Sequence, residues 1–140
     1  MSLPFGAAIP FVHHLGFTLE KFEGGESELR YVPRPEHLNS FDVTHGGAVM
    51  TLLDVVMATA ARSLEPDMGA ITIEMKTSFM RPARVATGQK LLAKGQVQHR
   101  TRSMVFTEGH VYGPDGELCA MATGTFKYMP RRASAPPSTD

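Results

Sequence analysis

The segment from Gly46 to Leu64 constrains the fold of this chain more than any other. Its 19 residues, GGAVMTLLDVVMATAARSL, are rich in Ala, Leu and Met, and they would form a helix about 28 Å long. Apolar side chains occur on every side of this helix, a pattern typical of a helix that is buried all round. We therefore predict one long helix that the rest of the chain must wrap.

The remaining chain carries six stretches whose composition predicts β-strands. Short connections between the later stretches favour antiparallel pairing, since a parallel crossover needs about a dozen residues or more. We predict an α+β fold in which a curved antiparallel β-sheet wraps one long central helix, in the order β-β-α-β-β-β-β. The expected strands are 17–22, 28–32, 70–80, 89–99, 103–112 and 117–128.

The expected strand 70–80 alternates between apolar and polar residues. Successive side chains of a strand point to opposite faces of the sheet, so one set of alternate residues shares a face. We expect that face to contact the core and the more polar one to face away. The core set is Ile71, Ile73, Met75, Thr77 and Phe79.

Length predicts a single domain, because 140 residues and 15.3 kDa suffice for one hydrophobic core and not for two. Residues 1–129 are assigned to that domain. The last segment, 130–140, has three prolines and no apolar periodicity, which predicts a flexible C-terminal tail.

Composition argues against several partners. Fourteen Lys and Arg balance fourteen Asp and Glu, so the chain lacks the overall positive charge that favours nucleic acid. Asp54 interrupts the longest apolar stretch before the roughly 20 residues of a membrane span, which argues against a membrane partner. The first ten residues lack the pattern of a signal peptide, and Cys119 is the only cysteine. These features predict a cytoplasmic protein.

Asp54 is the strongest candidate for a functional residue. It is the only charged residue between Gly46 and Ala61, and its neighbours are apolar. An ionised carboxylate in such a place loses several kcal/mol of hydration, so it must be paired, open to a cleft, or raised in pKa. The structural alternative is an Asp that bonds to the backbone or follows a narrow polar stripe with Thr51 and Arg62.

The pair Gly46-Gly47 stands where the helix is expected to begin, and the first amides of a helix have no partner within it. Glycine lets a ligand oxygen approach these amides, and the helix dipole favours negative charge there. The alternative is that the glycines only allow close packing against the sheet. Eight residues separate Gly46 from Asp54, about 12 Å along a helix, too far for one small reacting carbonyl to touch both. A catalytic function therefore predicts a homodimer in which Gly46 of one protomer faces Asp54 of the other.

Other sequence signals are weaker. His45 and Asp54 lack the spacing of a helical metal pair, and no serine-hydrolase elbow, P-loop or dinucleotide motif is present. We expect no metal and no cofactor. Cys119 lies in an apolar strand and is expected to be a packed thiol. Four arginines flank strand ends, where they could meet phosphates, although solvated turn charges are the commoner explanation: Arg81, Arg84, Arg100 and Arg102.

The candidate residues form the pattern NxxxxxHGGxxxxLxD, from Asn39 through His45-Gly46-Gly47 to Leu52-Leu53-Asp54, followed by the strand end Phe79-Met80-Arg81-Pro82-Ala83. In combination these motifs make residues 15–128 similar to the hotdog-fold acyl-CoA thioesterases. The chain resembles in particular the PaaI-like (phenylacetate-pathway) branch of the 4-hydroxybenzoyl-CoA thioesterase superfamily.

The resemblance implies a role for each matching residue. Asp54 would be the catalytic carboxylate, as nucleophile or general base, and the Gly46 amide would bind the thioester carbonyl oxygen. Asn39 would position the carbonyl or the attacking water, His45 would support the turn or the substrate, and Thr72 would hold the water. Gly47, Met50, Arg81 and Arg84 are the candidate substrate-binding residues. The resemblance also implies a homodimer, and commonly a homotetramer.

The expected reaction is hydrolysis of an acyl-CoA carrying a small aryl or a short- or medium-chain acyl group, with coenzyme A (CoA) as part of the substrate. Two alternatives stay open: a non-catalytic acyl-CoA binding module, and a hotdog dehydratase or hydratase. The second would normally pair a catalytic His with an Asp, and the position of His45 directly before the glycines does not fit that spacing.

Overall fold

The computed structural model describes residues 2–131 of the chain. One long helix and six strands account for most of it, and a short helix that the sequence did not predict precedes the first strand. The elements are α1 (Pro10–Leu15), β1 (Thr18–Glu23), β2 (Glu26–Tyr31), the 3₁₀ helix η1 (Pro35–His37), α2 (Gly46–Leu64), β3 (Met68–Phe79), β4 (Leu91–Arg100), β5 (Met104–Tyr112) and β6 (Leu118–Pro130).

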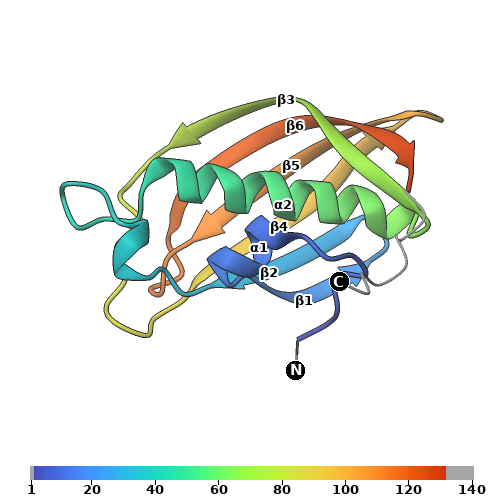
Figure 1. Cartoon of the computed structure of the whole chain (residues 1–140). Helices are drawn as coiled ribbons and strands as arrows, with labels where there is room; N and C mark the ends of the chain where they lie inside the picture. Colours follow the sequence, from blue (N-terminus) through green and yellow to red (C-terminus); the bar gives the residue numbers. More distant parts are fainter. Residues whose placement is uncertain (1, 132–140) are drawn as a thin grey trace, which may run out of the picture.

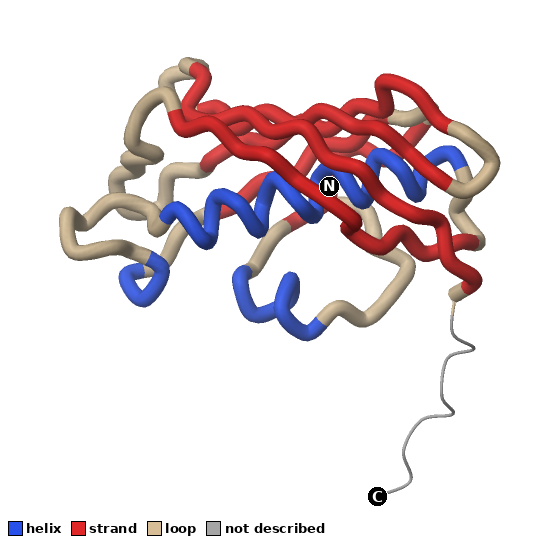
Figure 2. Tube along the Cα trace, turned by 90° about the horizontal axis from the view of Figure 1, so that it is seen from above, coloured by secondary structure: helices blue, strands red, loops and turns tan. Residues whose placement is uncertain are grey.

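The six strands form one antiparallel sheet in the order β1-β2-β4-β5-β6-β3. The sheet curves around α2, which runs along its inner face (Figure 1). Seen from above, the strands cross over the helix along its length (Figure 2). The predicted α+β class with one central helix is therefore confirmed. Strand β3 follows α2 in sequence but lies at the free edge of the sheet beside β6.

The core lies between α2 and the inner face of the sheet. Leu52, Leu53, Val56 and Met57 of the helix are fully buried. At Gly95 of β4 the helix comes so close that a Cβ atom would collide with the carbonyl of Val56. The missing side chain thus lets helix and strand meet backbone to backbone. By length and composition α2 could cross a membrane, but it is the core helix of this fold, with half of its length buried.

One face of α2 stays open in a single protomer. Along it lie Gly47 and Met50, which are exposed, and Asp54, Val55 and Ala58, which are half-buried. The expectation that the helix is buried all round is therefore wrong for one protomer. The sheet wraps the other faces of α2 and leaves this strip uncovered.

The predicted core face of β3 is right for Met75 and Thr77, which are half-buried, and wrong for Ile71, Ile73 and Phe79, which are exposed. The pairing with β6 shifts between Thr72 and Glu74, which marks a β-bulge. The extra residue reverses the alternation, so Thr72 faces the helix while Ile71 and Ile73 are 50% and 55% exposed. Met75, beyond the bulge, packs against the core as expected.

The C-terminal boundary differs slightly from the prediction. Pro130 is the last residue of β6 and pairs with Met68 rather than beginning a tail. Arg131 follows, and its guanidinium donates hydrogen bonds to the carbonyls of Gly6 and Pro66. The rest of the predicted flexible tail, residues 132–140, lies outside the described part of the chain.

Candidate active site

Asp54 lies in the middle of α2 and faces Thr72 of β3. The Thr72 hydroxyl donates a hydrogen bond to Asp54, with 2.5 Å between Oγ1 and Oδ1. Asp54 is half-buried, and burial raises the pKa of its carboxyl group, while the hydrogen bond from Thr72 lowers it by less. The bulge after Thr72 produces this contact, because it sets the direction in which the strand's side chains point.

The start of α2 leaves one backbone amide free. His45 is the N-cap residue, and its Nδ1 accepts a hydrogen bond from Gly47 N–H at 2.9 Å. The amides of Ala48 and Val49 donate to the His45 carbonyl at 2.9 and 3.1 Å. Within residues 2–131 the Gly46 N–H has no acceptor. Of the two glycines, Gly46 is therefore the one whose amide can bind a ligand oxygen.

The ring of Phe79 lies against Gly46, and a Cβ built on Gly46 would be 3.6 Å from it. Such a side chain would take up the space between the helix start and the ring. Gly47 was predicted to contact the substrate, but its N–H donates to the imidazole of His45 in the helix cap and is not free for a ligand. His45 thus supports the turn in this structure.

Asn39 organises the loop that leads to the helix. Its Oδ1 accepts hydrogen bonds from the backbone amides of Phe41 and Val43, at 2.9 and 3.2 Å. Its backbone N–H donates to the Val43 carbonyl. Asp42 in this loop has a φ of 55°, in the left-handed region. Because the side-chain oxygen is occupied, Asn39 has only its NH₂ group left to offer a substrate carbonyl or a water.

A mostly apolar cavity of about 460 Å³ opens beside Gly46. The sequence predicts only part of its wall, because the wall combines three separate segments of the chain. Thr44 ties two of them together, since its hydroxyl and its amide both donate to the Ala83 carbonyl, at 2.8 and 3.4 Å. The lining residues are Asn39, Phe41, Val43, Thr44, Gly46, Val49, Phe79, Met80, Arg81, Pro82, Ala83, Arg84, Cys119 and Ala120.

Cys119 borders this cavity but is 4% exposed. Burial raises the pKa of its thiol, which disfavours the reactive thiolate. The residue is the packed thiol that the sequence predicted. The described residues include no group of three or more His, Cys, Asp or Glu side chains that could hold a metal ion.

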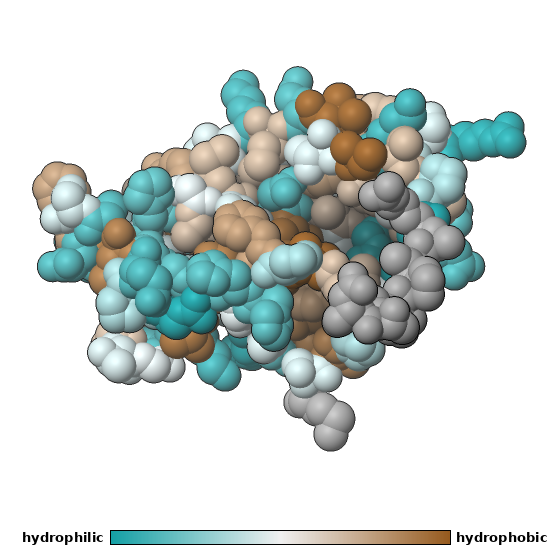
Figure 3. Space-filling model, viewed as in Figure 1, coloured by the Kyte–Doolittle hydropathy of each residue, from teal (hydrophilic) through white to brown (hydrophobic). Residues whose placement is uncertain are grey.

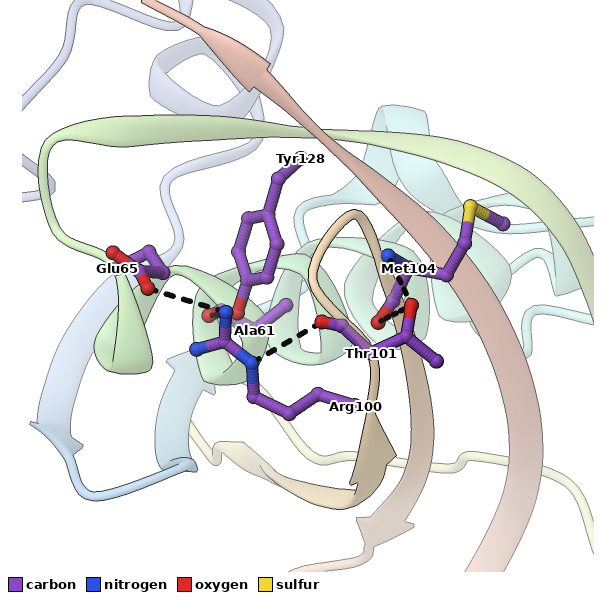
Figure 4. A network of polar contacts seen from close by, with 6 residues as sticks. All are labelled: Ala61, Glu65, Arg100, Thr101, Met104 and Tyr128. Atoms are coloured by element: carbon purple, nitrogen blue, oxygen red, sulfur yellow. Dashed lines mark hydrogen bonds and ion pairs between the residues drawn. The ribbon is translucent and has the colours of Figure 1, made fainter.

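The candidate arginines fall into different settings. Arg81 and Arg84 border the cavity, where Arg81 pairs with Glu117 and Asp115, and Arg84 has no ion pair within residues 2–131. Arg100 is part of a structural network (Figure 4): it pairs with Glu65 at 3.1 Å and lies over the ring of Tyr128. The Tyr128 hydroxyl in turn donates to the carbonyl of Ala61 in α2. Arg102 is exposed in the turn between β4 and β5.

A single protomer does not bring all the candidates together. Asn39, Gly46, Arg81 and Arg84 share the cavity, whereas Asp54 is absent from its lining. Asp54 lies farther along the helix, where Thr72 of β3 contacts it. Met50, 37% exposed, lies on the open face of the helix between Gly46 and Asp54. The carboxylate and the free amide thus lie on one helix, eight residues or about 12 Å apart.

Comparison with known proteins gives this arrangement a context. The family model described as thioesterase superfamily matches residues 41–120. The structure of the conserved protein PA5202 from Pseudomonas aeruginosa is 28% identical, with a TM-score of 0.81, and covers 89% of this chain and 97% of that one. A mutant of the phenylacetic acid degradation protein PaaI from Thermus thermophilus is 25% identical, with a TM-score of 0.75, and covers 85% and 98%.

Human acyl-coenzyme A thioesterase 13 is 26% identical over 72 residues, which are 51% of this chain and 50% of that protein. Among the curated relatives that match, the chain spans between 50% and 85% of their length.

Proposed function

Because this chain belongs to the thioesterase superfamily, we propose that it hydrolyses acyl-CoA thioesters and that Asp54 is the catalytic carboxylate. Membership confirms the resemblance predicted from the sequence and makes the chain a thioester hydrolase. One observation carries the assignment to Asp54: a half-buried carboxylate, bonded to one hydroxyl, lies on the open face of the helix whose first amide is free.

The proposed chemistry begins at the thioester carbonyl carbon. The ionised carboxylate of Asp54 either attacks this carbon or removes a proton from the water that does, and Thr72 holds the carboxylate in place. Negative charge then develops on the carbonyl oxygen, where the Gly46 amide and the positive end of the helix dipole stabilise it. Asn39 directs its NH₂ group toward the same oxygen. In the general-base route the C–S bond then breaks, the CoA sulfur takes the proton that Asp54 removed from water, and the free acid is released. In the nucleophilic route loss of the CoA thiolate leaves an anhydride between the acyl group and Asp54, which a water molecule hydrolyses to the free acid and the carboxylate. We propose no metal or redox cofactor for these steps.

The site is proposed to form between two protomers, with Gly46 of one opposite Asp54 of its partner. Two surfaces support this arrangement. The first is the uncovered strip of α2 that carries Met50 and Asp54. The second is the free edge of the sheet at β3, where Ile71 and Ile73 are exposed and hydrophobic side chains gather at the top of the view in Figure 3. A pair of such edges can add strand to strand and cover both strips. Further pairing into a tetramer stays a prediction.

The substrate class is proposed from the wall of the cavity. Phe41, Val43, Val49, Phe79 and Met80 surround the space beside Gly46 with apolar groups. A volume of about 460 Å³ is within the range of small-molecule pockets. We propose a small aryl or a short- or medium-chain acyl group.

The test is thiol release from a panel of aryl-, short- and medium-chain acyl-CoAs by the wild type and by Asp54→Asn. We expect the variant to keep its fold and oligomeric state and to lose activity on the order of 10²- to 10⁴-fold, because Asn can neither attack nor take a proton. Asp67→Asn is the matched control, since Asp67 is an exposed acid beyond the end of α2. A wild type that binds acyl-CoA without hydrolysing it would indicate a binding module. Hydration or dehydration of an enoyl- or hydroxyacyl-CoA without thiol release would indicate the dehydratase class.

A further inference from the structure

Three neighbouring cavities, which share lining residues pairwise and are together called the trough, lead away from the candidate active site. The cavity beside Gly46 shares Arg81, Arg84 and Cys119 with a second cavity of about 490 Å³. The second shares Gly113 and Pro114, in the turn between β5 and β6, with a third of about 450 Å³. The third lies on the outer face of the sheet, over β2, β4 and β5. A long ligand held at Gly46 can therefore extend past the turn between β5 and β6 onto this face.

The far end of the trough is basic. Arg30, Lys90 and Lys94 line the third cavity, and no acidic residue does. Lys90 and Lys94 form no ion pair within residues 2–131, although Lys94 is the cross-strand neighbour of Glu28. Arg30 has one long contact, 3.7 Å, with Glu20. The wall thus carries two lysines without an ion pair and an arginine with only one long one.

The middle of the trough carries fewer unpaired positive charges than its far end. Arg81 is neutralised by Asp115 and Glu117, whereas Arg84 has no acidic partner among the described residues. One aromatic ring, Tyr112, lines the third cavity, and the Lys94 Nζ lies 5.8 Å from its centre. Successive cations and an aromatic face suit a ligand that combines several phosphates with a flat base.

We propose that this trough binds the 3′-phosphorylated ADP portion of CoA, with Lys90, Lys94 and Arg30 contacting its phosphates and Arg84 near the diphosphate. The assignment rests on the proposed acyl-CoA thioesterase function and deepens it. Lys90 directly precedes β4 and Lys94 lies within it. Four residues of extended chain span about 13 Å, so the two can contact phosphates at separate points of an extended ligand. The base stacks on Tyr112.

The experiment compares two substrates that share one acyl group, an acyl-CoA and the corresponding N-acetylcysteamine thioester, which lacks the nucleotide. For Lys94→Gln and Lys90→Gln we expect the KM for acyl-CoA to rise about three- to tenfold with kcat retained, because charge-assisted contacts to phosphate are lost. Hydrolysis of the short thioester should not change. Lys127→Gln is the control, since it removes an equal charge from an exposed position on β6, outside all three cavities.

A binding measurement separates this proposal from the proposed function. Adenosine 3′,5′-bisphosphate should bind the wild type in calorimetry, and more weakly to Lys94→Gln than to Lys127→Gln. Equal binding to both variants, or equal KM changes for both substrates, would overturn the trough assignment while leaving the thioesterase function intact. A wild type that binds this probe but hydrolyses neither thioester would support the trough and overturn the function.

Discussion

The hydroxyl of Thr72 and the carboxylate of Asp54 connect the edge strand of the sheet to the central helix, with 2.5 Å between their oxygens. The two residues are 18 positions apart in sequence, and only the bulge in β3 turns Thr72 toward the helix. The bond favours the ionised form of Asp54, which is the form that can attack or take a proton.

Replacing Thr72 by Val is expected to remove this bond with little change in shape. Without the donor, the pKa of Asp54 rises further, so the acidic limb of the kcat/KM profile should move to higher pH. Thr72→Ser keeps the hydroxyl and should leave the limb in place. The measurement is the pH dependence of kcat/KM for the three proteins. If the limb stays fixed in Thr72→Val, the bond does not control the ionisation of Asp54.

Asp54→Asn is expected to be more stable than the wild type near neutral pH. Burial raises the pKa of the folded carboxyl above its ordinary value of 3.8, so the folded state holds this proton more tightly than the unfolded state. The cost of the buried charge is therefore fully present above the folded pKa and absent below about 3.8. Calorimetry at several pH values should show a Tm advantage for the variant at pH 7 that shrinks on acidification. An advantage that grows at low pH would contradict the assignment.

Gly46→Pro tests the oxyanion amide, because proline lacks an N–H and is well tolerated at the first helical position. His45 already has φ −57° and ψ 136°, a conformation that a following proline favours. We expect a folded dimer with little activity.

Mixing this variant with Asp54→Asn tests the shared site. If Gly46 and Asp54 of different protomers cooperate, each heterodimer has one intact site, so random exchange should restore about a quarter of wild-type activity. Thiol release is measured after the two inactive proteins have been unfolded and refolded together. Refolding each variant alone is the control. No recovery in a mixture shown to contain heterodimers would place the site within one protomer.

Gly95→Ala is expected to destabilise the fold by about 1 to 3 kcal/mol, because the added methyl group collides with the Val56 carbonyl. The Ser27 hydroxyl, which donates to the same carbonyl at 2.5 Å, would have to shift as well. Gly69→Ala is the control, since its Cβ would meet ordinary contacts of 3.6 Å or more. Urea unfolding of both variants gives the comparison, and equal midpoints would show that helix and strand can separate without cost.

The sequence predicts the helix well because its signal is local. Its bounds, Gly46 to Leu64, agree with the structure, and Asp54 interrupts an otherwise apolar run that needs no tertiary information to recognise. The succession of elements along the chain and the antiparallel pairing of the later strands follow from turn residues and short connections, but the place of β3 beside β6 was not predicted. The start of the helix is local too, although the bond that occupies Gly47 and leaves Gly46 free required the geometry of His45.

Features that depend on contacts between distant segments could not be predicted. The bulge after Thr72 has no signature in a regular apolar and polar alternation, so the expected core face of β3 is wrong at Ile71 and Ile73. The cavity wall combines the loop after Asn39 with the β3–β4 connection and Cys119, which meet only in the folded chain. The open strip on α2 could not be predicted for a similar reason, because an apolar helix face does not indicate whether a sheet of the same chain or another subunit covers it.

The bulge in β3 adds one residue that has no partner in β6. On one side of it the strand turns Thr72 inward, and on the other Met75 enters the core, with Ile71 and Ile73 left outside. Loss of Ile73 alone would leave every other pair with β6 in register, and Thr72 and Met75 would both still face inward. A regular strand that kept all its residues, with Met75 in the core, would instead turn Thr72 away from Asp54. The unpaired residue therefore lets one strand serve both the hydrophobic core and the carboxylate.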